Sequence, residues 1–182
     1  MTEHKEQNLA WIDLEMTGLC PEKDYILEIA SLVTDNQLNI IAQGPSIIIH
    51  QPEAALRMMN DWVAKQHAKT GLVEAVERSI ITVEQAEQET IAFLGTYCKP
   101  GTSPLCGNSV WQDRAFIRLA MPSLNNFLHY RIIDVTSIKE VIKYWYPNDP
   151  RTAFKKQDSH RALDDIKESV AELAYYRQKF FI

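Results

Sequence analysis

Residues 8–19 read NLAWIDLEMTGL, an apolar segment that contains two acidic residues and ends in a glycine turn. Residues 8–14 are short and mostly apolar, which is typical of a buried strand. Gly18 and Pro21 then interrupt regular structure. Asp13 and Glu15 lie two positions apart at the end of this strand. Because strand side chains alternate between faces, both carboxylates are predicted to point the same way, with Ile12 and Leu14 on the opposite face.

The remaining pattern predicts a mixed α/β sheet of five strands flanked by helices. Residues 26–33 are rich in β-forming side chains, and the turn at 35–37 leads into strand segments at 38–41 and 47–49. Two short strands are expected at 105–107 and 131–135. Helices are expected at 53–59, 61–70, 72–78, 82–98, 110–120, 137–146 and 159–180, with Thr82 and Gln85 forming a capping box. Residues 147–156 are expected to be a polar loop.

Composition narrows the class of protein. Of the 182 residues, 46% are hydrophobic and 24% are charged, which is typical of a globular domain. No apolar run approaches the roughly 18 residues of a membrane span, and residues 1–9 lack the apolar core of a secretion signal. The three cysteines have no metal-ligand spacing, and their odd number predicts a reducing compartment, the cytoplasm. The net charge of −5 argues against long duplex nucleic acid as the main partner.

Acidic residues carry the predicted chemistry. Buried carboxylates close to each other repel, and a hard divalent cation such as Mg²⁺ or Mn²⁺ between them relieves the repulsion. Alternatively, Glu15 lies beyond the strand and both acids are solvated. Asp113 follows a short strand at the start of a helix. It is either a third carboxylate at the sheet edge or a helix-start residue that favours the helix dipole.

The segment from His160 to Asp165 leaves two acids in competition for the site. If His160 lies inside the last helix, Asp164 shares its face at a spacing of four residues. If His160 lies on the loop before the helix, Asp165 can be the ligand. The residue types alone leave both arrangements open.

Taken together, the runs WIDLEMTGL (11–19), GNSVWQDRAFI (107–117) and HRALDDIKESVAELAYY (160–176) resemble the three motifs of the DEDDh 3′-to-5′ exonuclease superfamily. The similarity is closest to the branch that degrades very short RNA, and it extends to MMNDW (58–62) and HYRIIDVTSIKE (129–140). It implies an RNase H-like fold and a single exonuclease domain over residues 1–182. It also implies that two divalent cations are held by Asp13, Glu15, Asp113 and Asp165. His160, with an ordinary pKa near ~6.5, is expected to be the general base.

The same resemblance implies a set of substrate-binding residues. Leu19 is expected to wedge between two bases and Trp62 to stack on a base; the alternatives are loop packing for Leu19 and a core position for Trp62. His67 and Ser109 are expected to contact phosphate or sugar. The cap on the 5′ phosphate is expected from three further residues, Tyr130, Arg131 and Thr136. In this arrangement the tyrosine comes from the second subunit of a homodimer, which makes dinucleotides the preferred substrate. Tyr130 as a core strand residue is the alternative.

Three other functions are compatible with this residue pattern. The nearest is a DEDDh exonuclease that acts on longer RNA or DNA 3′ ends. A nucleic-acid-binding module without activity is a second, although the presence of all five catalytic positions argues against it. An α/β interaction protein with coincidental motifs is a third, and the joint occurrence of the motifs in order argues against it.

Overall fold

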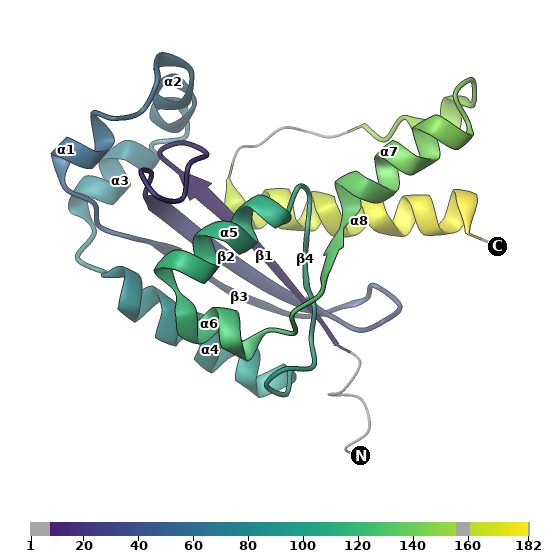
Figure 1. Ribbon diagram of the computed structural model, residues 1–182, viewed down its shortest axis with the longest axis horizontal. Helices are drawn as coiled ribbons and strands as arrows, with labels where there is room; N and C mark the ends of the chain where they lie inside the picture. Colours follow the sequence, from purple (N-terminus) through teal and green to yellow (C-terminus); the bar gives the residue numbers. More distant parts are fainter. Residues whose placement is uncertain (1–7, 156–160, 182) are drawn as a thin grey trace.

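The computed structural model describes residues 8–155 and 161–181, and a five-stranded sheet lies at its centre (Figure 1). The strand order is β3-β2-β1-β4-β5. β1 pairs antiparallel with β2, and β2 with β3, whereas β4 runs parallel to β1 and β5 runs parallel to β4. The predicted mixed sheet is therefore confirmed. The strands are β1 (Leu9–Met16), β2 (Ile26–Thr34), β3 (Ile40–Ile48), β4 (Leu105–Gly107) and β5 (Ile132–Asp134).

The two faces of β1 belong to different layers. Ala10, Ile12 and Leu14 pack in one apolar cluster with α4 (Val83–Tyr97), α5 (Trp111–Ala120) and α6 (Pro122–Phe127). Trp11 packs on the other face with α7 (Val135–Trp145) and α8 (Ala162–Phe180). By alternation, Asp13 and Glu15 share the face of Trp11 and therefore face α8. Figure 1 shows α8, in yellow, beginning near the arrowhead of β1 and crossing the direction of that strand, and α8 contacts both β1 and β2.

A small helical unit covers one end of β2 and β3. It consists of α1 (Glu53–Leu56), α2 (Asp61–Lys69) and α3 (Leu72–Arg78), and it buries Leu56, Leu72 and Val76 against Leu27. The predicted capping box at the start of α4 is confirmed, since Thr82 and Gln85 exchange side-chain and backbone hydrogen bonds. No helix in the described part of the chain is long and apolar enough to cross a membrane.

Several predicted boundaries were wrong. The first short helix ends at Leu56 rather than residue 59, and residues 40–48 form one strand instead of two segments. α6 was not expected; Pro122 opens it, as proline suits the first turn of a helix. α7 begins at Val135 because the Asp134 side chain accepts the Thr136 N–H and caps the helix. A 3₁₀ turn, Pro150–Thr152, lies inside the expected loop, and the last helix begins at Ala162 instead of residue 159.

Candidate active site

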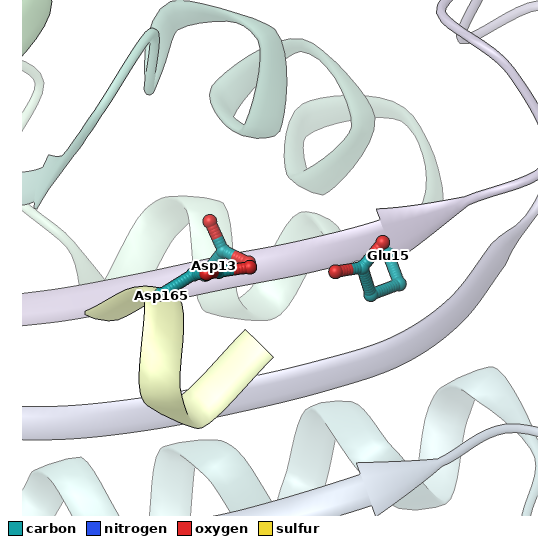
Figure 2. Close-up of side chains that lie close together, drawn as sticks. All are labelled: Asp13, Glu15 and Asp165. Carbon is teal, nitrogen blue, oxygen red and sulfur yellow. The ribbon is translucent and has the colours of Figure 1, made fainter. Parts of the chain in front are cut away.

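Three carboxylates meet between β1 and the first turn of α8. Asp13 and Glu15 come from β1 and Asp165 comes from α8, and one oxygen from each lies within 4.8 Å of the others (Figure 2). The two-residue spacing on the strand places Asp13 and Glu15 on one face, as the sequence predicts. The packing of α8 on β1 and β2 then brings in Asp165 from a distant part of the chain.

Asp113 reaches the same region from the first turn of α5. Its Oδ1 accepts the Leu14 N–H at 3.0 Å, and its side chain is buried. β4 pairs with β1 only at Ala10 and Trp11, so Leu14 lies beyond the end of that pairing. Asp113 thus satisfies a backbone donor located between the two acids of β1. It is not one of the three residues whose oxygens lie together, but its negative charge acts on Asp13 and Glu15.

Burial and like charge raise the pKa values of these acids. Burial, the largest cause, and the charges of Asp165, Glu28 and Asp113 together raise the pKa of Glu15 to about 8. Burial raises the pKa of Asp113 to about 7, against the lowering effect of the Leu14 N–H. Burial, followed by the charges of Asp113 and Glu15, raises the pKa of Asp13 well above its ordinary range. Such a group of oxygen ligands retains protons at neutral pH unless a cation replaces them.

The start of α8 decides between Asp164 and Asp165. The first helical residue is Ala162, and Arg161 before it has an extended backbone with φ of −131°. His160 therefore precedes the helix in sequence, although it lies outside the described residues. Asp164 points away from the cluster; it is exposed and lies 4.0 Å from Lys167 Nζ. Asp165 is the acid that joins Asp13 and Glu15.

A cavity of about 380 Å³ opens beside Glu15. Its wall includes Leu19, which is 72% exposed, and Trp62, which is 66% exposed, so Trp62 is not a core residue. Asn60 caps α2 by accepting the N–H groups of Trp62 and Val63, which orients this helix end beside the acids. An aromatic and an aliphatic side chain left in solvent next to a cluster of carboxylates suit the stacking of nucleobases.

The loop that carries Leu19 has an ordered structure. Asp24 accepts hydrogen bonds from Thr17 Oγ1 at 2.9 Å and from the Cys20 N–H at 2.9 Å. A Cβ at Gly18 would lie 2.5 Å from Asp24 Oδ2, so a larger residue there would displace the Asp24 carboxylate from these hydrogen bonds. Gln112 on α5 donates to the Leu19 carbonyl oxygen at 2.6 Å. These contacts hold Leu19 at the cavity rather than in a packed core.

His67 lies in the same wall but is buried. Its Nε2 lies 2.9 Å from the Met16 carbonyl oxygen, and its Nδ1 lies 3.8 Å from Glu15 Oε2. The imidazole therefore contacts both the end of β1 and one of the acids. A contact between His67 and substrate stays a prediction.

Ser109 and Thr136 are brought together by Asp134. The Ser109 backbone has φ of +50°, a left-handed conformation that is unfavourable for a residue with a side chain. Its N–H donates to Asp134 Oδ1 at 3.0 Å and to Thr136 Oγ1 at 2.9 Å. The Thr136 N–H also donates to Asp134 Oδ1, at 2.9 Å. Asp134 was not singled out from the sequence; its signal was an acidic residue immediately before a helix.

Tyr130 and Arg131 lie on the surface before β5. Tyr130 is 72% exposed, so it is not a core strand residue, and the Arg131 guanidinium lies 5.2 Å from the centre of its ring. Arg114 donates to the His129 carbonyl oxygen at 3.1 Å and anchors this segment to α5. Neither Tyr130 nor Arg131 is among the described residues that line the cavity beside Glu15.

Sequence reasoning also missed Glu28, a buried acid on β2 that pairs in register with Glu15. Glu28 accepts a hydrogen bond from Ser46 and forms an ion pair with Arg161, with 3.2 Å between Arg161 Nη2 and Glu28 Oε1. This pair attaches the residue before α8 to the sheet. The available signal was a charged residue inside the apolar run of residues 26–33, because a buried acid needs a partner.

Comparison with known proteins assigns the family. A sequence model of the exonuclease family of RNase T type matches residues 10–173. The oligoribonuclease of Marinobacter nauticus is 52% identical over 173 residues, which cover 95% of this chain and 96% of that protein. The oligoribonuclease of Acinetobacter baylyi is 47% identical over 182 residues, which cover 100% of this chain and 99% of that protein.

Solved structures agree on the fold. Exonuclease I from Methylocaldum szegediense superposes with a TM-score of 0.68 at 17% identity, covering 96% of this chain and 41% of that chain. E. coli exonuclease I in complex with a dA16 oligonucleotide gives a TM-score of 0.69 at 14% identity, with the same coverage of 96% and 41%. This chain therefore spans about two fifths of the length of these two structures, and the likeness shows the fold alone. Since the family match covers most of the chain and the relatives are about half identical over nearly their full length, the chain belongs to the exonuclease family of RNase T type and, within it, to the oligoribonucleases.

Proposed function

We propose that this protein hydrolyses very short RNA from the 3′ end to mononucleotides, with dinucleotides as its preferred substrates. The observation that carries this proposal is the group of Asp13, Glu15 and Asp165 beside a cavity walled by Leu19 and Trp62. Carboxylates suited to metal-assisted hydrolysis thus adjoin exposed side chains suited to bases. The full-length similarity to proteins named oligoribonuclease supports the choice of short RNA over other substrates.

Four acids are proposed to hold two divalent cations, Mg²⁺ or Mn²⁺. Asp13 would contribute to both sites, Glu15 and Asp165 would complete one of them, and Asp113 would support the other. The residues fit this task, because all donors are oxygens and their pKa values are raised first by burial and then by neighbouring negative charge, both of which a bound cation offsets. Two such cations supply a nucleophile at neutral pH and relieve charge on the phosphoryl oxygens.

His160 is proposed to be the general base. Its ordinary pKa near ~6.5 suits it to accept the proton of the attacking water. Its place in the sequence just before α8 supports this role, because Asp165 lies in the first turn of that helix. The ion pair between Arg161 and Glu28 attaches the residue before α8 to the sheet.

Substrate selection is proposed to involve both sides of the acids. Trp62 stacks on one base, Leu19 wedges between two, and His67 lies where a sugar or phosphate can reach it. On the other side, Arg131 and Thr136 form the cap on the 5′ phosphate of a dinucleotide, and Ser109 lies where a phosphate or sugar can reach it. The Arg131 guanidinium is an appropriate donor to a phosphate, and Thr136, whose hydroxyl donates to Asn108 Oδ1, accepts the Ser109 N–H and holds Ser109 in place.

A homodimer is proposed to complete the cap, with Tyr130 reaching the site of the second copy. Its exposure supports this, since a solvated tyrosine beside Arg131 is available to a partner. At the C-terminal end of α7, Tyr144 is 83% exposed and Trp145 is 73% exposed. Trp145 also lines an apolar cavity of about 360 Å³ between α7 and the end of α8. Exposed apolar surface of this kind is typical of an interface. We further propose that the chain works as one exonuclease domain in the cytoplasm.

A timed digest of 5′-labelled RNAs from two to twenty nucleotides long tests the proposal. Each RNA is incubated with Mg²⁺, Mn²⁺ or EDTA, and Asp113→Asn serves as the matched inactive variant. Much faster cleavage of the dinucleotide, abolished by EDTA, is the expected result. Equal or faster cleavage of the long RNA would reject the capped site and favour an exonuclease of longer 3′ ends. No cleavage with either metal would favour a binding module.

A further inference from the structure

Three side chains, joined by four hydrogen bonds, connect the Ser109 N–H with the helix turn that carries Asp165. Thr136 Oγ1 accepts the Ser109 N–H at 2.9 Å and donates to Asn108 Oδ1 at 3.1 Å. Asn108 Nδ2 donates to Ser169 Oγ at 2.8 Å, and the Ser169 hydroxyl donates to the Asp165 carbonyl oxygen at 2.8 Å. Each hydroxyl proton is used once, so the directions of these hydrogen bonds are mutually consistent.

Glu172 determines which way the Asn108 amide points. This carboxylate is 1% exposed, and its Oε2 accepts a second hydrogen bond from Asn108 Nδ2 at 3.0 Å. Its Oε1 accepts the Tyr176 hydroxyl at 3.0 Å and lies 3.4 Å from Lys139 Nζ. Burial raises the pKa of Tyr176, so its hydroxyl remains a donor. Flipping the amide would direct Asn108 Oδ1 at the buried carboxylate, which disfavours that orientation.

We propose that Asn108 is a positioning residue that sets the distance between the substrate-binding residues Ser109 and Thr136 and the metal ligand Asp165. Asn108 acts on both through its two ends while its amide is engaged within the protein. This inference rests on the proposed function for the role of Ser109 and Thr136. Its consequence is that one side chain outside both sites controls cation affinity and dinucleotide affinity together.

Asn108→Asp is the main variant. It keeps the acceptor for Thr136 but replaces the donor to Ser169 with an oxygen directed at Glu172. Asn126→Asp, on the exposed surface of α6, is the matched control for the change in charge. Ser169→Ala removes only the link from Asn108 to the Asp165 carbonyl. Tyr176→Phe removes a hydrogen bond to the other oxygen of Glu172, outside the path between the two sites, and controls for loss of stability.

Two quantities are measured for each folded variant. Mn²⁺ affinity is obtained from the paramagnetic resonance of free Mn²⁺, without substrate. KM and kcat are obtained with a 5′-phosphorylated dinucleotide. Asn108→Asp is expected to weaken Mn²⁺ binding and raise KM, each by roughly tenfold, as loss of an outer-sphere contact typically does. Ser169→Ala is expected to weaken Mn²⁺ binding with KM little changed, and both controls are expected to resemble the wild type.

The proposal is overturned if Asn108→Asp changes only one of the two quantities, or neither. It is also overturned if Tyr176→Phe shifts both as strongly, because the effect would then follow stability. If Asn108→Asp does not fold, the Mn²⁺ affinities of Ser169→Ala and Tyr176→Phe are compared instead. Unchanged Mn²⁺ affinity in Ser169→Ala would then reject the proposed link between Asn108 and Asp165. If the wild-type protein binds Mn²⁺ but neither binds nor hydrolyses dinucleotides, the proposed function is refuted. The Mn²⁺ affinities of the variants would still test the link between Asn108 and Asp165.

Discussion

Replacing Glu15 with glutamine should stabilise the cation-free protein, and the gain should grow as the pH rises. The folded pKa of Glu15 is about 8 against an ordinary value of 4.5, so between these values the folded protein holds a proton that the unfolded chain has released. Stability from this proton is fully present below the unfolded pKa and is lost as pH rises through the folded one. The loss is about 1.4 kcal/mol per pH unit, or about 3 kcal/mol between roughly pH 5.5 and 7.5. Glutamine carries no such proton.

Thermal unfolding in EDTA measures this effect. For a domain of this size, about 3 kcal/mol corresponds to roughly 6–12 °C, so the advantage of Glu15→Gln should widen by that amount over the pH range. Glu77→Gln, on the exposed surface of α3, is the control, and its midpoint of thermal unfolding should change with pH as that of the wild type does. Saturating Mg²⁺ at the higher pH should stabilise the wild type more than Glu15→Gln, because a bound cation favours the ionised carboxylate. If the unfolding midpoints of Glu15→Gln and the wild type in EDTA changed equally with pH, the reasoning would be refuted.

Three further predictions concern the general base, the base-stacking residue and a helix cap. His160→Ala should slow single-turnover hydrolysis by roughly 10²- to 10⁴-fold while leaving Mn²⁺ affinity within about twofold, and unchanged turnover would remove its role as general base. Trp62→Ala should raise the KM for a dinucleotide by roughly 5- to 100-fold through lost stacking, with kcat little changed. Trp111→Ala is the control, because Trp111 is also exposed but lies on α5. Equal KM values in the two variants would contradict the stacking role of Trp62. Thr82→Ala should lower the free energy of unfolding by about 1 kcal/mol, because the capping box is lost. Thr96→Ala, at an exposed position inside the same helix, should lower it less. Identical denaturant midpoints for the two variants would count against the cap.

Local pattern was sufficient for part of the fold. The alternation along β1 placed Asp13 and Glu15 together with no knowledge of their neighbours, and the spacing of Thr82 and Gln85 identified the start of α4. Both depend on residues a few positions apart, where strand and helix geometry leave little freedom. Pro122 was present in the sequence, but α6 was missed because a helix of six residues is too short to show a periodicity.

Exposure, in contrast, depended on packing. Trp62 and Tyr130 were each compatible with a core position, because large aromatic side chains are usually buried to a large extent. The structure leaves both in solvent, Trp62 at a cavity beside Glu15 and Tyr130 on the surface before β5. Glu28 shows the reverse case, an acid buried in the sheet with its partner Arg161 more than a hundred residues away.

The sequence by itself predicted Asp13, Glu15 and Asp113 as metal ligands and His160 as the general base, and it indicated the family of nucleases. The residue types alone left open whether Asp164 or Asp165 joins the site, and the family resemblance implied Asp165. That choice depended on where α8 begins, and the extended backbone of Arg161 before Ala162 resolved it. The reason is physical. The spacing of residues on one strand or helix follows from local geometry, whereas the approach of α8 to β1 depends on the packing of distant apolar surfaces, to which every element of the sheet contributes.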